Sequence, residues 1–116
     1  MKLKRDDTVR LQHMADAASS AIAFVQDCTV ADLQHDLMRR LAIVKLVEII
    51  GEAASRVSEP ARESAPEISW RDIVGTRNRL VHAYFDVDLD VLWITATRDL
   101  PALLAQLRDV LAAQLD

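Results

Sequence analysis

The sequence has few of the residues that build turns and sheets. Its 116 positions include only two glycines, three prolines and 4% aromatic residues, while 51% are hydrophobic. This composition suits long helices rich in alanine and leucine and leaves a sheet without the turn residues it needs. It predicts an all-α protein. A chain of this length buries one hydrophobic core, so we expect a single domain over residues 1–116.

Several classes of site and location are disfavoured by what is missing. The one cysteine, Cys28, cannot form an internal disulfide and has no companions for a zinc site, so we interpret it as packing at a helix end. His13 and His35 fall on different predicted helices, and we expect no metal and no cofactor. No apolar run approaches the roughly 18 residues of a membrane span, and the start MKLKRDDTVR is charged. We expect a cytoplasmic protein without membrane contact.

A basic surplus is also absent. The chain carries 18 acidic and 14 basic residues, a net charge of −4, whereas nucleic-acid-binding proteins usually have a basic surface. The charge argues against broad affinity for RNA. It leaves room for a local basic cleft, because Arg71, Arg77 and Arg79 lie within nine positions of one another.

Apolar residues at helical spacing predict four amphipathic helices. The first helix begins near Asp6 and Asp7, which can serve as its caps, and ends near residue 27. The second covers residues 29–57 and begins with a capping box formed by Thr29 and Asp32. The third begins at a Ser69–Asp72 capping box and weakens near 82–86, and the fourth covers 89–115 after an Asp88 cap, with a kink at Pro101. The expected buried positions are Leu11, Met14, Ala18, Ala21 and Val25 in the first, Leu33, Leu37, Leu41, Val44, Val47, Ile50, Ala54 and Val57 in the second, and Leu92, Ala96, Leu100, Leu103, Leu107 and Val110 in the fourth.

Short connectors between these helices favour an antiparallel, up-and-down four-helix bundle. Ser58 followed by Pro60 predicts one extra helical turn in the connector after the second helix. Gly51, in the small-residue run IIGEAA, costs helix stability and therefore indicates a close contact with another helix.

The run RNRLVHAY, residues 77–84, gathers the chemically versatile side chains of the chain. Arg77 is a permanent cation, Asn78 a hydrogen-bonding group, His82 titrates near neutral pH and Tyr84 is a phenol. On an ideal helix Asn78 and His82 share a face, but Arg77 and His82 differ by about 140°. The two converge on one phosphate only at a distorted helix end or in a cleft that a second subunit completes.

These residue types suit attack of an RNA 2′-hydroxyl on its own phosphate, which would leave a cyclic phosphate without any metal. A histidine moves the proton and an arginine binds the phosphate oxygens. Composition and spacing alone also fit a solvent-exposed helix face with Tyr84 at the edge of the core. Glu48 and Glu52 lie on a helix that could face the cleft, although exposed surface carboxylates are the simpler interpretation. Trp70 and Trp93 are interpreted as packing anchors.

The motif R-x4-H-x-Y resembles that of the HEPN superfamily. The segments VEIIGEAA, SWRDIVGTRNRLVHAYFDVD and DLPALLAQL are similar to its HepT-like branch, formerly described only as a domain of unknown function, and the resemblance covers nearly the whole chain. It implies a four-helix bundle that forms a homodimer with both motifs in one cleft. It also implies a metal-independent ribonuclease with Arg77 and His82 as the catalytic pair and Asn78 in support.

The same resemblance implies a toxin–antitoxin pair. The partner would be a minimal nucleotidyltransferase antitoxin that transfers AMP to the motif tyrosine, here Tyr84, and the substrate class would be tRNA. Arg71 and Arg79 are candidate RNA contacts. The alternative is a non-catalytic helical dimer that binds and regulates a nucleotidyltransferase, which the acidic net charge favours.

Overall fold

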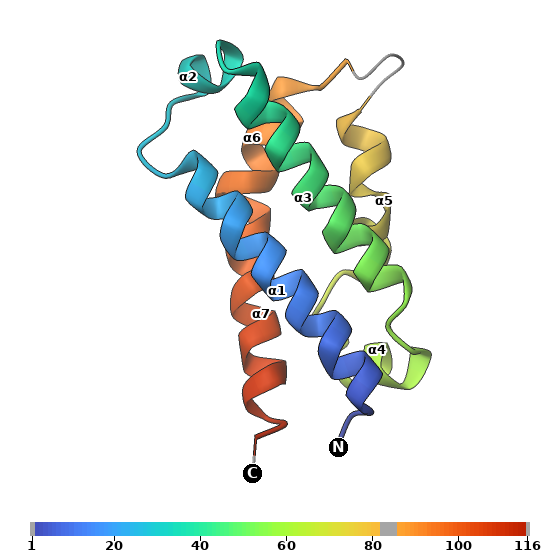
Figure 1. Cartoon of the computed structure of the whole chain (residues 1–116). Helices are drawn as coiled ribbons and strands as arrows, with labels where there is room; N and C mark the ends of the chain where they lie inside the picture. Colours follow the sequence, from blue (N-terminus) through green and yellow to red (C-terminus); the bar gives the residue numbers. More distant parts are fainter. Residues whose placement is uncertain (1, 82–85, 116) are drawn as a thin grey trace.

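The chain runs alternately up and down through a set of helices and brings both termini to the same end (Figure 1). The computed structural model describes residues 2–81 and 86–115. Its elements are α1 (Arg5–Val25), α2 (Val30–Gln34), α3 (Leu37–Ser55), α4 (Glu59–Ser64), α5 (Trp70–Leu80), α6 (Leu89–Ile94), a π-helical turn (Thr95–Asp99) and α7 (Leu100–Ala112). The predicted all-α bundle is confirmed.

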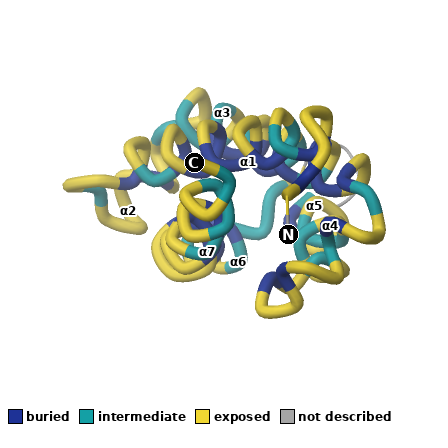
Figure 2. Tube along the Cα trace, turned by 90° about the horizontal axis from the view of Figure 1, so that it is seen from below, coloured by how far each residue is buried: buried dark blue, intermediate teal, exposed yellow. Residues whose placement is uncertain are grey.

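The long helices pack as an elongated, flat bundle of 45 × 29 × 19 Å. Helices α1 and α3 lie side by side, α7 packs on α1, and α5 packs on α3 (Figure 1). Viewed along the bundle, buried positions line the sides on which helices face one another and exposed positions cover the outside (Figure 2). No helix in the described part of the chain is long and apolar enough to cross a membrane.

Helix α1 confirms the predicted apolar stripe but not its predicted caps. The residues buried as predicted are Leu11, Met14, Ala18, Ala21 and Val25. Lys4 is the N-cap and makes no side-chain capping bond. The buried Asp7 instead accepts hydrogen bonds from the Ser58 backbone N–H at 2.8 Å and the Ser58 hydroxyl at 2.6 Å. This carboxylate ties the start of α1 to the connector after α3.

The single long helix predicted over 29–57 is wrong in one place. The Thr29–Asp32 capping box is present, but it opens only the short α2. The Asp36 carboxylate then accepts the Arg39 backbone N–H and caps a new helix, because aspartate competes well for the free donors of a first turn. The break turns Leu37 and Leu41 outward, where they are 58% and 44% exposed instead of buried. The remaining predicted positions of this stripe are buried: Leu33, Val44, Val47, Ile50, Ala54 and Val57.

The connector between α3 and α5 contains the predicted extra helical turn. It is α4, with Ser58 as N-cap and Pro60 in its first turn. The predicted Ser69 capping bond at the start of α5 is absent. Trp70 anchors this end of α5 instead, since its indole N–H donates to the Ala65 carbonyl at 3.2 Å and the Arg62 guanidinium lies 5.9 Å from its ring centre. The expected packing role of Trp70 is thereby supported.

The predicted fourth helix begins where expected, and an irregular turn interrupts it shortly before Pro101, the residue at which a kink was predicted. The Asp88 carboxylate accepts the Val91 N–H and caps α6 as predicted. A π-helical turn, Thr95–Asp99, then precedes Pro101. Proline has no N–H for the carbonyl of Thr97, so the extra residue of a π turn is a physically reasonable response. The buried stripe holds at Leu92, Ala96, Leu100, Leu103 and Leu107, while Val110 is half-buried.

Candidate active site

The predicted motif lies at the C-terminal end of α5. Arg77 is in the last turn of the helix, which ends at Leu80. Beyond it, the Asp88 N–H donates to the Leu80 carbonyl at 2.9 Å, and Val81 pairs with Val87 in an isolated antiparallel bridge. His82 and Tyr84 lie outside the described residues, so their roles stay predictions. The helix does end before His82, as the spacing argument requires.

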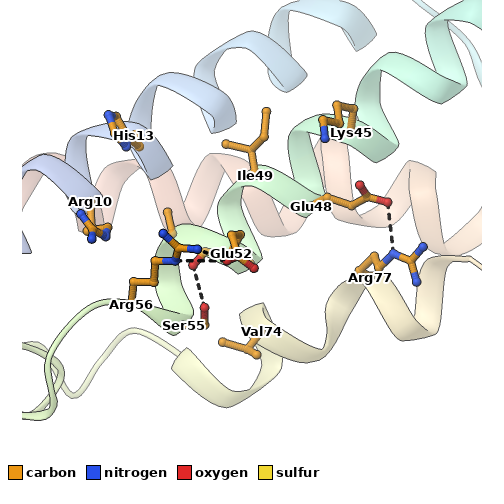
Figure 3. Close-up of a pocket in the computed structure, with 12 residues that line it drawn as sticks. Arg10, His13, Lys45, Glu48, Ile49, Glu52, Ser55, Arg56, Val74 and Arg77 are labelled. Atoms are coloured by element: carbon orange, nitrogen blue, oxygen red, sulfur yellow. Dashed lines mark hydrogen bonds and ion pairs between the residues drawn. The ribbon is translucent and has the colours of Figure 1, made fainter.

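Arg77 forms an ion pair that connects α5 to α3. Its Nε donates to Glu48 Oε1 at 3.1 Å, with 45% of the arginine side chain and 29% of the glutamate side chain exposed (Figure 3). Within the described residues no partner holds the two Nη atoms of Arg77. The guanidinium is therefore positioned through one nitrogen and keeps its terminal fork open for an anion.

Helices α5 and α3 approach each other closely at Gly51. A Cβ at this position would lie 3.5 Å from the Ile73 carbonyl oxygen, already in van der Waals contact. Any longer side chain would push the two helices apart. The predicted close helix contact at Gly51 is confirmed, and its consequence is to bring Arg77 within reach of Glu48.

A groove of about 650 Å³ opens between α1, α3 and α5, with Arg77 and Glu48 in its wall. Figure 3 shows side chains from all three helices around it: Arg10 and His13 from α1, Lys45, Glu52 and Arg56 from α3, and Val74 from α5. Four cationic side chains face two carboxylates. The groove therefore carries a local positive excess on a chain whose net charge is −4.

The other predicted basic contacts do not share this groove. Arg79 lines a separate cavity between α5 and α7, and its Nη2 donates to the Thr76 hydroxyl at 2.9 Å. Arg71 and Asn78 are exposed and do not line the groove. The structure thus does not bring Arg71, Arg77 and Arg79 into one basic cleft, and RNA contacts by Arg71 and Arg79 stay predictions.

The sequence pointed to Arg77 but not to its surroundings. Glu48 lies 29 positions away from Arg77, and the simpler interpretation made it a surface carboxylate. Only its position on the same face of α3 as Lys45, Glu52 and Arg56 hinted at a shared groove. Arg10 and His13 gave no usable signal, because nothing in the sequence shows which side of α1 faces α3 and α5.

Together, the helical bundle, the end of α5 and the groove with its positive excess define an all-α protein with a candidate anion-binding site. The chain belongs to the ribonuclease HepT-like family, whose pattern matches residues 14–110. No solved structure matches the chain.

The related proteins agree with this assignment over most of their length. A protein of Thermococcus cleftensis named "Probable ribonuclease HepT" is 35% identical over 101 residues, covering 87% of this chain and 92% of its own. A protein of Methanocaldococcus jannaschii, provisionally named an RNase, is 35% identical over 98 residues, covering 84% of this chain and 90% of its own. Family and relatives together support a ribonuclease function.

Proposed function

We propose that this chain is a metal-independent endoribonuclease in which Arg77 and His82 act on a phosphate of RNA. The observation that carries the proposal is the position of Arg77 in the wall of a groove with a positive excess, where Glu48 holds its Nε and no other described residue binds its two Nη atoms. The ribonuclease names of the relatives support the same reaction class. A forked guanidinium binds two phosphate oxygens at once and stabilises the charge that builds up on them.

The proposed reaction needs one proton acceptor and one proton donor. The ribose 2′-oxygen attacks the adjacent phosphorus as its proton passes to a base, and the bond from phosphorus to the 5′-oxygen breaks as that oxygen gains a proton. The products are a 2′,3′-cyclic phosphate and a 5′-hydroxyl. His82 serves one of these transfers, since imidazole exchanges protons near neutral pH. Arg77 stabilises the phosphorane-like transition state.

The reaction class is tested with a substrate that lacks the attacking group. The purified protein should cut RNA in the presence of EDTA and leave cyclic phosphate ends, identified by mass spectrometry. An oligonucleotide with a single 2′-deoxy sugar at the cut position should stay intact. Cleavage of that oligonucleotide, or loss of activity with EDTA that a divalent cation restores, would overturn the metal-independent mechanism.

We further propose a homodimer whose two motifs share one cleft. The groove-lining stripe of α3 continues toward its N-terminal end as an apolar surface, on which Leu37, Met38 and Leu41 are 58%, 82% and 44% exposed. Large side chains this exposed on one helix end favour an interface. Because Arg77 lies near the same end of the molecule, a twofold contact there would bring the two sites together.

The toxin–antitoxin pairing is part of the same proposal. A minimal nucleotidyltransferase would neutralise the ribonuclease by transferring AMP to Tyr84, placing phosphate charge near Arg77 and blocking the RNA phosphate; tRNA is the proposed substrate. The protein purified with this partner should gain the mass of one or more AMP units, and Tyr84→Phe should not. An unchanged mass in the active partner's presence would contradict the modification.

The acidic net charge of −4 favours a second candidate function, that of a non-catalytic dimer that regulates a nucleotidyltransferase. It predicts a stable complex with that partner and no RNA products at any protein concentration. Expression without the partner separates the two, because a ribonuclease toxin should arrest growth and a regulatory module should not.

A further inference from the structure

Beyond the Arg77–Glu48 pair, the groove contains cations that the proposed reaction does not use. Arg10, Lys45 and Arg56 line it together with His13 (Figure 3). Arg56 is paired with Glu52 at 2.9 Å, an exposed contact that costs little to exchange. Within the described residues no carboxylate pairs with Lys45 or Arg10, and the buried Nε of Arg10 has no hydrogen-bond partner. An anion in the groove would supply the charge partner that Lys45 and the Arg10 guanidinium lack among the described residues.

The cations are spread along the groove instead of gathering at one point. Lys45 lies in α3 and Arg56 is its C-cap residue, eleven positions further along the chain, which corresponds to about 16 Å at the helical rise. An unpaired strand is more extended than the roughly 3.4 Å per nucleotide of a duplex strand, so this distance accommodates a few nucleotides. A single small anion would occupy only one end.

We propose that this groove binds the sugar–phosphate backbone of an unpaired RNA segment next to the cut, with Arg77 and Lys45 at one end and Arg10, His13 and Arg56 at the other. The inference rests on the proposed ribonuclease function, because the groove begins at Arg77. Between the cations, Ile49 and Val74 are 37% and 41% exposed and offer apolar surface to ribose or base faces. Only an unpaired strand presents base faces to a protein surface.

The groove also explains how an acidic chain can bind RNA. Its lining has a positive excess of two charges, counting Arg10, Lys45, Arg56 and Arg77 against Glu48 and Glu52. The remaining residues, 10 basic and 16 acidic, carry a net charge of −6 that repels the polyanion overall. We therefore expect weak binding to RNA in general and selection for a strand that follows the groove.

The test uses the full chain and an RNA analogue that cannot be cut. A labelled, unstructured 2′-O-methyl oligonucleotide of mixed sequence is titrated by fluorescence anisotropy over a range of salt concentrations. The double variant Arg10→Gln, Lys45→Gln should bind about tenfold more weakly at low salt. It should also make the slope of log affinity against log salt concentration less steep by about 1.4. Each phosphate of a single strand that a cation neutralises contributes roughly 0.7 to that slope.

The matched control removes two positive charges outside the groove. Arg98→Gln with Arg108→Gln changes two exposed cations on the π-helical turn and α7, neither of which lines the groove. We expect it to bind like the wild type within about twofold. Since Arg10 is half-buried, the single variant Lys45→Gln is a second measurement, expected to lower the slope by about 0.7. Thermal melting by circular dichroism verifies that each variant is folded.

Several results would overturn the proposal. Equal weakening by groove and control variants would indicate only long-range electrostatics, and no weakening would remove the groove from RNA binding. Equal affinity of the wild type for a poly-glutamate peptide would identify a site for acidic protein segments instead. The binding probe is independent of catalysis. If the wild type cuts no RNA but the groove variant loses binding, the ribonuclease proposal fails and the groove proposal stands. If the wild type cuts RNA but the groove variant binds RNA as tightly as the wild type, the groove proposal fails and the ribonuclease proposal stands.

Discussion

The Glu48–Arg77 pair determines how much of the Arg77 guanidinium is available to a phosphate. The pair is partly exposed, so its contribution to stability is small, in the range of about 0–1 kcal/mol. Its effect on the site is larger, because the carboxylate holds Arg77 in place and also repels an incoming phosphate. Positioning and repulsion can be separated by keeping the shape of Glu48 and removing its charge.

We expect Glu48→Gln to lower KM for a short RNA several-fold while kcat stays within about threefold. The glutamine oxygen can still accept the Arg77 Nε–H, whereas the charge that repels phosphate is gone. Steady-state kinetics at low salt measures both constants. Glu52→Gln is the matched control, since that carboxylate lines the groove but is bonded to Arg56; it should leave kcat unchanged. A kcat that falls strongly only in Glu48→Gln would mean that the charge itself is needed for catalysis.

Single residues also show the limit of prediction from sequence. Arg77 is found because its motif is local, and Gly51 because glycine is costly within a helix. Glu48 is not identified as its partner, because the pairing depends on how α3 and α5 cross. Arg10 likewise reaches the groove only through the packing of α1. Contacts between side chains that are distant in the chain cannot be predicted from a single sequence.

At the scale of elements, hydrogen-bonded caps decide where helices begin. Asp32 accepts the Thr29 backbone N–H at 3.0 Å and Thr29 accepts the Asp32 N–H at 3.1 Å. The backbone and hydroxyl hydrogen bonds of Thr29 lower the pKa of Asp32 below its ordinary value of 3.8. The cap's support for α2 is therefore complete above that value and is lost as the pH falls through the lower pKa of the folded state.

The variant Thr29→Ala should raise the pKa of Asp32 toward its ordinary value, because it removes the hydroxyl that favours the ionised carboxylate. Carboxyl chemical shifts in an NMR titration report this pKa directly. The Asp36 cap of α3 does not involve Thr29, so the chemical shift of the Arg39 backbone N–H that it accepts is the internal reference and should be the same in both proteins. An Asp32 pKa unaffected by the substitution would contradict the capping-box account.

The buried Asp7 links two elements that are distant in sequence. Asp7→Ala leaves the Ser58 N–H and hydroxyl without their acceptor, so we expect the free energy of unfolding to fall by about 1–3 kcal/mol. Asp6→Ala, at the exposed neighbouring position, should change it by less than about 0.5 kcal/mol. Urea denaturation of both variants makes the comparison. Equal effects would show that the loss comes from helix-end charge and not from the Ser58 contacts.

Element boundaries were predictable where a cap and a pattern agreed and not where they competed. Residues 29–57 carry a continuous apolar pattern, so the break at Asp36 was missed even though aspartate is a strong N-cap. The start of α5 was predicted correctly, because Ser69 is its N-cap residue, although the side-chain bonds of the predicted capping box do not form. The position of the C-terminal irregularity was predictable because the missing N–H of Pro101 is a property of one residue.

For the whole molecule, the proposed homodimer rests on the exposed apolar stripe of α3 and on the spacing of Arg77 and His82. Met38→Asp places a charge in the proposed interface, where Met38 is 82% exposed in the single chain. We expect a shift from dimer to monomer in sedimentation velocity and a parallel loss of RNA cleavage. Leu115→Asp, at a residue 81% exposed near the C-terminus, should remain dimeric and active. A monomeric wild type, or a dimeric and fully active Met38→Asp, would contradict the shared cleft.

The overall bundle was largely predictable because it depends on features that sum along the chain. The scarcity of glycine and proline and four apolar stripes already indicate four antiparallel helices. These features do not show which apolar stripes pack against each other. The groove between α1, α3 and α5 was therefore not predicted. The acidic net charge pointed away from RNA because a sum over the chain hides a local positive surface.

The central claim, that Arg77 and His82 carry out RNA cleavage, is tested most directly by the kcat/KM of Arg77→Ala and His82→Ala on the same RNA. We predict that each variant remains a folded dimer by circular dichroism and sedimentation while kcat/KM falls by about 10²–10⁴. Cleavage at the wild-type rate by both variants would contradict the account.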